Sequence, residues 1–148
     1  MDWTPKVFLD TSALIAGLAS ATGASHVILA LAEAGLVQLV ISDEVLTEAE
    51  RNLQAKLPRA LPAYRRFLTA CPHQLIPSPS RKDVLMALQI IHPKDAPLLA
   101  AAMVQAVDYL VTLNTRDFMD DPEVSRQAGL RIGTPGDFLG WFRQGIKG

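Results

Sequence analysis

The sequence predicts an α/β fold, a three-layer arrangement in which a central parallel sheet of four to five strands has helices on both faces. Short apolar runs rich in β-branched residues alternate along the chain with helical segments of ten or more residues, which is typical of a parallel sheet. The chain has 148 residues, 49% of them hydrophobic, which is enough for one core and too few for a second independent domain. We therefore expect residues 1–148 to form a single domain.

The first expected strand is short and apolar. Residues 7–9, Val-Phe-Leu, are β-branched, aromatic and aliphatic, and they end at Asp10, which is typical of a buried strand. An Ala- and Leu-rich stretch follows. We expect it to form a helix that runs toward Leu18 with Ser12 at its N-cap.

A second helix and a second strand come next. The helix is expected after Gly23, with Ser25 as its N-cap and an apolar stripe on one face. Gly35 stands where a helix ends in the left-handed conformation. Residues 37–41 are continuously apolar apart from one glutamine, and they predict the second strand.

A long amphipathic helix is predicted from Ser42-Asp43 onward. Pro58 ends it, because proline lacks the N–H that a continuing helix needs. Apolar residues at steps of four predict its buried face, namely Val45, Ala49, Leu53 and Leu57.

The middle of the chain predicts two helices around one short strand. The first helix spans residues 62–72, because its aromatic and aliphatic residues recur at helical spacing. Residues 74–76 form the strand, residues 77–80 a Pro- and Ser-rich loop, and residues 84–88 the second, shorter helix.

The last third of the chain predicts two strands and two helices. Asp95 precedes Ala-Pro, an arrangement suited to the start of a helix over residues 96–103. Residues 109–112 form an apolar strand, and residues 131–132 a weaker one. A terminal helix is expected around residues 138–142.

The net charge of −1 conceals an uneven distribution. Residues 51–94 hold eight bases and one acid, whereas the rest of the chain holds six bases and fourteen acids. A basic helical arm is predicted at approximately residues 51–82, with Arg51, Lys56, Arg59, Arg65, Arg66, Arg81 and Lys82. Such a segment can bind a polyanionic partner or contact another protein. It can also be simply the solvent-exposed face of a helix.

The cysteine content and the hydropathy of the sequence predict where in the cell the protein is located. Cys71 is the single cysteine, so the chain has no intrachain disulfide and no thiolate cluster, which favours the reducing cytosol. The first seven residues lack the pattern of a signal peptide. Polar residues interrupt the two longest apolar stretches, residues 27–41 and 96–113, so we expect a cytoplasmic protein without a membrane span.

Acidic residues are expected to gather at one edge of the sheet. Ligands of an open parallel sheet bind beyond the carboxyl ends of its strands, and five acids follow a strand or open a helix there: Asp10, Glu44, Glu48, Asp95 and Asp117. Clustered carboxylates repel one another unless a cation or proton lies among them. Oxygen ligands suit Mg²⁺ or Mn²⁺.

Each acid also has a purely structural interpretation. Asp10 or Asp95 is suited to cap a helix, and Glu48 can pair with Arg51 one turn later on its helix. Asp117 is suited to a turn. These separate explanations account poorly for all the acids falling at the same end of the sheet.

Five sequence blocks, taken in their order and spacing, resemble the PIN domain family. They are VFLDTSAL at residues 7–14, ISDEVLTE at 41–48, KDA at 94–96, DYLVTLNTRDF at 108–118 and TPGDFL at 134–139. The resemblance covers roughly residues 6–142.

The resemblance implies a metal-dependent ribonuclease, most often the VapC-like toxin of a toxin–antitoxin pair. Asp10, Glu48, Asp95 and Asp117 match the family's acidic quartet, with Mg²⁺ or Mn²⁺ expected on Asp10, Asp95 and Asp117. The resemblance further implies single-stranded RNA as substrate, a cognate antitoxin as partner and a homodimer. We expect the seven bases of the basic arm to guide this RNA to the acidic site, or else to contact the antitoxin or a second subunit.

Secondary site candidates follow from the same resemblance. They are Thr11, Ser12, Glu44, Thr112 and Asn114. Thr11 or Ser12 matches the family's small hydroxyl residue, and Glu44 lies one turn from Glu48 on the same helix face. Many members have an acid where this chain has Asn114, which carries no charge.

Three other classes of protein are alternatives to this interpretation. A phosphoacceptor receiver domain needs an acid pair at the first strand and a later lysine where the chain has Leu113-Asn114. An aspartate-nucleophile phosphatase needs a second acid at the position of Ser12. The remaining alternative is a non-catalytic module that binds nucleic acid or a partner, which Asn114 favours.

Overall fold

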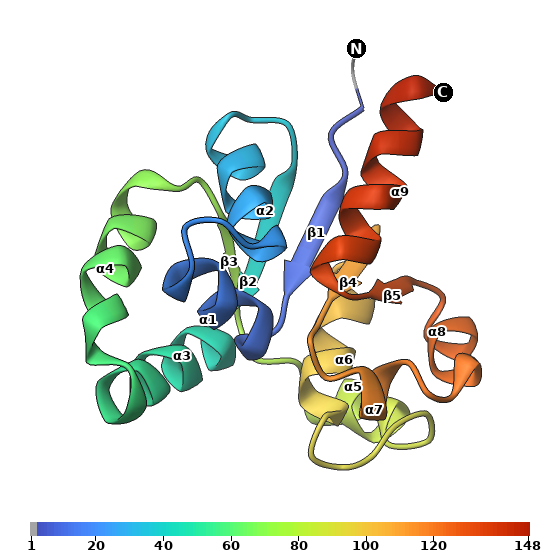
Figure 1. The fold of residues 1–148 in the computed structure, drawn as a ribbon. Helices are drawn as coiled ribbons and strands as arrows, with labels where there is room; N and C mark the ends of the chain where they lie inside the picture. Colours follow the sequence, from blue (N-terminus) through green and yellow to red (C-terminus); the bar gives the residue numbers. More distant parts are fainter. Residues whose placement is uncertain (1–2) are drawn as a thin grey trace.

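A five-stranded parallel sheet forms the centre of the molecule, as expected (Figure 1). The computed structural model describes residues 3–148. The strand order is β3-β2-β1-β4-β5, and the strands are β1 (Lys6–Leu9), β2 (Gln38–Ser42), β3 (Gln74–Ile76), β4 (Tyr109–Val111) and β5 (Arg131–Gly133). Val7 of the central strand pairs with Leu39 on one side and with Tyr109 on the other. The carboxyl ends of all five strands therefore share one edge.

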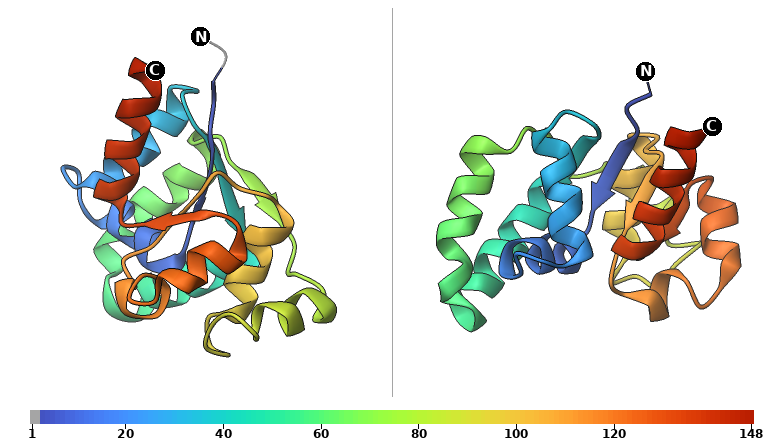
Figure 2. Two further views of the ribbon diagram at one scale, coloured as in Figure 1. Left: turned by 90° about the vertical axis from the view of Figure 1, so that its right-hand side faces the viewer. Right: turned by 45° about the horizontal axis from the view of Figure 1, so that its top comes forward.

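Five helices form one layer. They are α1 (Thr11–Ala19), α2 (Ala24–Glu33), α3 (Asp43–Lys56), α4 (Leu61–Ala70) and α9 (Pro135–Lys147). Helix α1 contacts α2, α3 and α4, and α2 contacts α9. The left view of Figure 2 shows α2 and α9 on one side of the sheet.

The opposite layer contains α5 (Arg81–Ala87) and α6 (Ala96–Val104), which pack against each other. The 3-10 turn η1 (Pro58–Ala60) joins α3 to α4. Along the chain, β4 is followed by two short helices, α7 (Thr115–Phe118) and α8 (Pro122–Ala128), and then by β5. The three-layer prediction is confirmed.

The core fills both faces of the sheet. Its largest fully buried side chains include Phe8 and Leu9 on β1, Leu110 on β4, Leu99 on α6 and Phe138 on α9. Each such side chain contributes on the order of 1.5–3 kcal/mol on removal from water. The stripe predicted along α3 is buried at three of its four positions, and its last member, Leu57, is half-buried.

Some element boundaries differ from those predicted. Asp10, rather than Ser12, is the N-cap of α1, and Gly23, rather than Ser25, is the N-cap of α2. Helices α7 and α8 were not predicted, because their 4 and 7 residues include too few apolar side chains to display a periodic stripe. Gly35 does adopt the left-handed conformation, with φ +77°.

The basic segment is not one continuous helical arm. Between residues 51 and 82 the chain completes α3, forms η1 and α4, returns to the sheet as β3 and begins α5. Its seven predicted RNA-binding bases are all exposed. Five of them lie on α3, η1 and α4, whereas Arg81 and Lys82 open α5 in the opposite layer (Figure 1). The seven bases therefore do not form one continuous surface, because β3 separates the α3–α4 region from α5.

No single helix in the described part of the chain has the length and apolar composition needed to cross a membrane. The bent pair α1 and α2, at 88° to each other, passes that test only when the two helices are taken together.

Candidate active site

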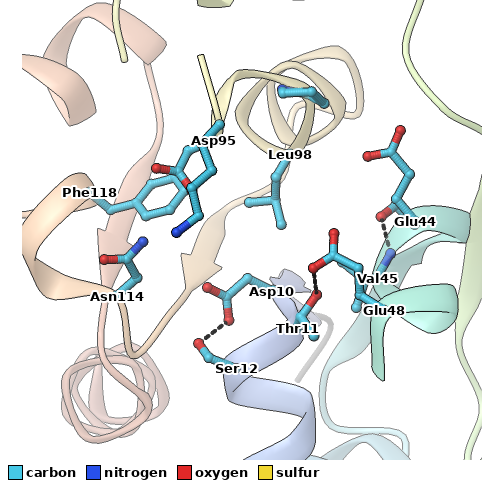
Figure 3. Close-up of a pocket in the computed structure, with 13 residues that line it drawn as sticks. Asp10, Thr11, Ser12, Glu44, Val45, Glu48, Asp95, Leu98, Asn114 and Phe118 are labelled. Atoms are coloured by element: carbon cyan, nitrogen blue, oxygen red, sulfur yellow. Dashed lines mark hydrogen bonds between the residues drawn. The ribbon is translucent and has the colours of Figure 1, made fainter. Parts of the chain in front are cut away.

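A cavity of about 270 Å³ opens at the carboxyl edge of the sheet, where acids were expected to gather. We call it the acidic cavity (Figure 3). Its lining comes from the ends of β1, β2 and β4 and from the starts of α1, α3 and α6. The polar residues that line it are Asp10, Thr11, Ser12, Ser42, Glu44, Glu48, Lys94, Asp95 and Asn114.

Asp10 is a buried residue of this lining and accepts three hydrogen bonds. It is 5% exposed. Its Oδ1 accepts from the Ser12 hydroxyl at 2.7 Å and from the Ala13 N–H at 2.8 Å, and its Oδ2 accepts a short hydrogen bond from the Thr112 hydroxyl. The Ala13 bond is the N-cap of α1, so the structural interpretation and the functional one apply to the same carboxylate.

Two hydroxyl groups connect Asp10 to the end of β4. The Leu113 N–H donates to Ser12 Oγ at 3.2 Å, and the Asn114 N–H donates to Thr112 Oγ1 at 2.8 Å. Because each hydroxyl accepts from a backbone N–H, its own hydrogen is left for the carboxylate. Both hydroxyls therefore direct a hydrogen toward Asp10, an arrangement that matches an ionised carboxylate.

The protonation of Asp10 is set by opposing effects. Burial raises its pKa, and the three donors act in the opposite direction. An ionised carboxylate has about four lone-pair sites. Three are occupied here, so Oδ2 retains one for a ligand in the cavity.

Asp95 presents an unsatisfied carboxylate oxygen. It lies at the start of α6 and is 9% exposed, and its side chain does not cap the helix. Its Oδ2 is buried without a hydrogen-bond partner within residues 3–148. Burial and the neighbouring Asp117 carboxyl raise the pKa of Asp95, which Lys94 and His92 partly oppose. An orphaned buried acceptor is costly and marks this oxygen as a ligand position.

Asp117 lies beside Asp95 but does not line the cavity. The Asn114 amide donates to its Oδ2 at 3.0 Å, and the Asp117 N–H donates back to Asn114 Oδ1 at 3.3 Å. The first of these bonds lowers the pKa of Asp117. The two carboxyls therefore differ in the direction of their shifts: Asp95 favours its proton and Asp117 its charge.

Glu44 and Glu48 line the opposite wall of the cavity from α3 (Figure 3). Both are exposed, and Ser42 caps the helix through the Val45 N–H at 3.2 Å. Glu48 Oε2 accepts from the Thr11 hydroxyl at 3.4 Å, which ties α3 to α1.

Lys94 and Ser42 line the cavity although they were not site candidates. The Lys94 side chain is the one Lys or Arg in a lining that also contains Asp10, Asp95, Glu44 and Glu48. Its position next to Asp95 was the sequence signal that could have identified it. Ser42 could also have been identified from the sequence. It is a helix N-cap directly after a strand, and in a parallel sheet such a residue lies at the carboxyl edge.

The donor chemistry fits a hard divalent cation. Within residues 3–148 no three His, Cys, Asp or Glu side chains stand close enough to form a ready metal site. Asp10, with a spare lone pair, and Asp95, with an orphaned Oδ2, nevertheless line the same cavity, and carboxylate oxygens are the ligands that Mg²⁺ and Mn²⁺ prefer.

Known proteins resemble this chain in sequence pattern and in fold. The sequence profile of the PIN domain matches residues 6–116. The crystal structure of VapBC2 from Rickettsia felis, bound to a DNA fragment from their promoter, matches with a TM-score of 0.60 and 17% identity, over 86% of this chain and 96% of that chain.

A second solved structure, PAE2754 from Pyrobaculum aerophilum, matches with a TM-score of 0.62 and 16% identity, over 95% of this chain and 96% of that chain. No curated protein matches the sequence. At these identities the two structures support the fold, and the profile identifies the family.

Proposed function

The chain belongs to the PIN domain family, and from this membership and the acidic cavity we propose that it is a metal-dependent endoribonuclease acting on single-stranded RNA. The observation that carries the proposal is the orphaned Oδ2 of Asp95, buried in a cavity that also contains the nearly satisfied Asp10 carboxylate. Two carboxylates with unused acceptor capacity on one cavity are suited to share a cation.

Asp10 and Asp95 would hold Mg²⁺ or Mn²⁺, with Asp117 beside them. When bound, such an ion lowers the pKa of a water molecule and neutralises charge that develops on the phosphate. The hydrogen bonds from Thr112 and Ser12 favour the ionised form of Asp10, against the effect of burial on its pKa, and fix its orientation. Asn114 holds Asp117 in place rather than facing the cavity as a charged ligand.

Glu48 is assigned to the attacking water. Its Oε2 is occupied by the Thr11 hydroxyl, so Oε1 is free to accept a proton from a water molecule in the cavity. Glu44, one turn earlier, is the second acid on the same wall. Lys94 supplies positive charge to the substrate phosphate from the opposite wall, next to Asp95.

The bases of α3 and α4 extend this site along the surface. Arg51 lies less than one turn beyond Glu48, and Lys56, Arg59, Arg65 and Arg66 follow it on α3, η1 and α4. We assign these five to the RNA backbone, and Arg81 and Lys82 to a separate basic surface at the start of α5. Binding through phosphate contacts releases counterions and weakens with salt.

The proposal extends to a cellular role as the toxin of a toxin–antitoxin pair. The sequence resemblance to VapC-like toxins and the fold shared with VapBC2 support a cognate antitoxin, and a homodimer is proposed on the same resemblance. Cys71 is buried, and burial raises the pKa of its thiol to about 11, which suits a protein kept in the reducing cytoplasm.

A cleavage assay with a panel of single-stranded RNAs tests the activity. Wild type should cleave with Mn²⁺ and not with EDTA, and Asp95→Asn should cleave far more slowly with Mn²⁺ and not with EDTA. Asp95→Asn is preferred to Asp10→Asn, because an amide at position 10 would turn a donor toward groups that already donate to it. If wild type binds RNA but leaves it intact with Mn²⁺, the non-catalytic alternative is correct.

A further inference from the structure

A second cavity, of about 260 Å³, lies at the same edge of the sheet, next to the acidic cavity. We call it the donor cavity. It is formed between α1, the starts of α2 and α9, and the loop after β4, and its lining residues are Ala16, Ser20, Gly23, Ala24, Ser25, Leu113, Thr134, Pro135 and Gly136. No acidic or basic side chain contributes to this lining.

The two cavities are separated by about one step of the chain. Ser12 lines the acidic cavity and Ala16 the donor cavity, four residues on along α1, which is a rise of about 6 Å. The consecutive residues Asn114 and Leu113 also line different cavities: Asn114 the acidic cavity and Leu113 the donor cavity. This separation is comparable with that of neighbouring phosphates in a single strand.

The starts of two helices meet at the donor cavity. Helix α2 has 10 residues, no acid in its first turn and a glycine N-cap, so the Ala24 and Ser25 N–H groups receive no side-chain acceptor. At the start of α9, Pro135 has no N–H and the Asp137 N–H is capped by Thr134, which leaves the Gly136 N–H. Both helix dipoles present positive ends here.

Ser25 provides an independent sign of a missing ligand. It is 4% exposed, and its Oγ has no hydrogen-bond partner anywhere in residues 3–148. A buried hydroxyl without a partner costs free energy, and native proteins rarely tolerate one without a reason. Here the residue lines a cavity that already offers N–H donors.

The remaining polar groups of the cavity are donors as well. Ser20 Oγ accepts from the Thr22 and Gly23 N–H groups, and Thr134 Oγ1 accepts from the Asp137 N–H, so each hydroxyl has its own hydrogen left to donate. The nearest acid on these elements, Asp137, is engaged with the Thr134 N–H. The few polar groups of this mostly apolar cavity can therefore donate hydrogen bonds, and no acidic side chain lines it, which suits an anion.

We propose that the donor cavity binds the phosphate group next to the scissile one, so that the RNA strand is held at two consecutive positions. This inference rests on the proposed ribonuclease function and adds a second binding position to it. Leu113, 48% exposed at the junction of the cavities, provides an apolar surface for the intervening nucleoside. The strand would pass from the acidic cavity over Leu113 to the starts of α2 and α9.

Gly23→Asp is the most discriminating variant. Gly23 has φ −78° and ψ 167°, the extended conformation of an N-cap, and an added Cβ would come no closer than 3.4 Å, to Ser20 Oγ. Aspartate is a preferred N-cap, so the variant should fold at least as stably as wild type. Its carboxylate would occupy the α2 N–H groups and repel a phosphate.

The measurement is the Kd of a labelled single-stranded oligoribonucleotide in EDTA, where no cleavage occurs. Gly23→Asp should weaken binding about five- to tenfold, with a Tm equal to or above that of wild type. The matched control is Gly148→Asp, which adds the same charge about 18 Å along α9 from Gly136 and should not change the Kd. Equal Kd values for the two variants would overturn the proposal.

Ser25→Ala and amide chemical shifts give a second test. Ser25→Ala removes the unpartnered hydroxyl, so it should leave the Tm unchanged or raise it while weakening binding two- to threefold. In ¹⁵N spectra, the oligonucleotide and, separately, inorganic phosphate should shift the Ala24 and Gly136 amides. RNA cleavage without these shifts contradicts the donor cavity alone. Phosphate-induced shifts without RNA cleavage contradict the ribonuclease proposal alone.

Discussion

The acidic cavity and the donor cavity lie side by side at one sheet edge, yet their chemistry is opposite. One is lined by four carboxylates with a single lysine among them, whereas the other is mostly apolar, with a few hydroxyl and N–H groups and no charged side chain. Each contains one buried polar atom without a partner in the described chain, Asp95 Oδ2 in the first and Ser25 Oγ in the second. The difference teaches that an unsatisfied carboxylate oxygen points to a cation, whereas an unsatisfied hydroxyl, which can donate, suits an anion when it lies beside free N–H groups.

The largest expected effect comes from removing the charge of Asp95. Asp95→Asn should lower the Mn²⁺-dependent cleavage rate by roughly 10²- to 10³-fold, as expected for the loss of one electrostatic contribution to a transition state. The Tm should stay equal or rise, because the like-charged neighbour Asp117 is then relieved. Rates come from single-turnover cleavage and Tm from thermal unfolding followed by circular dichroism.

Leu98→Met is the matched control, because it changes an apolar residue of the same cavity without altering its charge. Cleavage by Asp95→Asn at the wild-type rate would show that Asp95 is only a structural residue.

The second effect concerns the support of Asp10. Thr112→Val keeps the shape of a fully buried side chain but removes the donor to Asp10 Oδ2 and the acceptor of the Asn114 N–H. We expect unfolding in urea to require about 1–3 kcal/mol less free energy, with a lower cleavage rate. Thr112→Ser, which keeps the hydroxyl, should retain most of both. Equal losses in the two variants would mean that packing of the methyl group, and not the hydroxyl, supports the site.

A smaller effect tests which basic surface the RNA strand follows away from the acidic cavity. Arg65→Glu/Arg66→Glu on α4 should weaken oligonucleotide binding about tenfold and reduce the slope of log K against log salt concentration. Arg81→Glu/Lys82→Glu makes the same change of charge at α5, in the opposite layer, and should have the smaller effect. A larger effect at α5 would reverse the assignment of the basic surface, as would a wild-type Kd that does not respond to salt.

The smallest effect is a pH dependence of stability. The pKa of Asp95 is raised in the folded protein, so the folded state binds its proton more tightly than the unfolded state does. Its contribution to stability is therefore present at low pH and is lost as the pH rises from about 4, the unfolded pKa, through the higher folded pKa. Asp95→Asn lacks this loss. The Tm difference between variant and wild type should become more positive from pH 3.5 to pH 7, and a constant difference would contradict the raised pKa.

The sequence by itself determined the architecture, because the signals involved are local. Apolar runs predicted β1, β2 and β4, and shorter segments that contain a polar residue predicted β3 and β5. Gly35 and Pro58 marked helix ends, glycine because it can adopt the left-handed conformation and proline because it lacks an N–H. The parallel order of the strands placed Asp10, Glu48 and Asp95 at one edge before any side chain was seen. Their convergence on one cavity agrees with that prediction.

Only the tertiary structure decided the hydrogen-bond partners and the burial of each site residue, because the residues that contact it are distant in the sequence. Asp10 and Thr112 meet across 102 positions of the sequence. Nothing near Asp95 in the sequence reveals that one of its oxygens is buried without a partner. Asp117 lies behind the cavity wall because Asn114 holds it there, and β3 divides the basic segment that looked continuous. The donor cavity depends on α2 and α9, more than a hundred residues apart, starting side by side, and no pattern within either helix encodes that proximity.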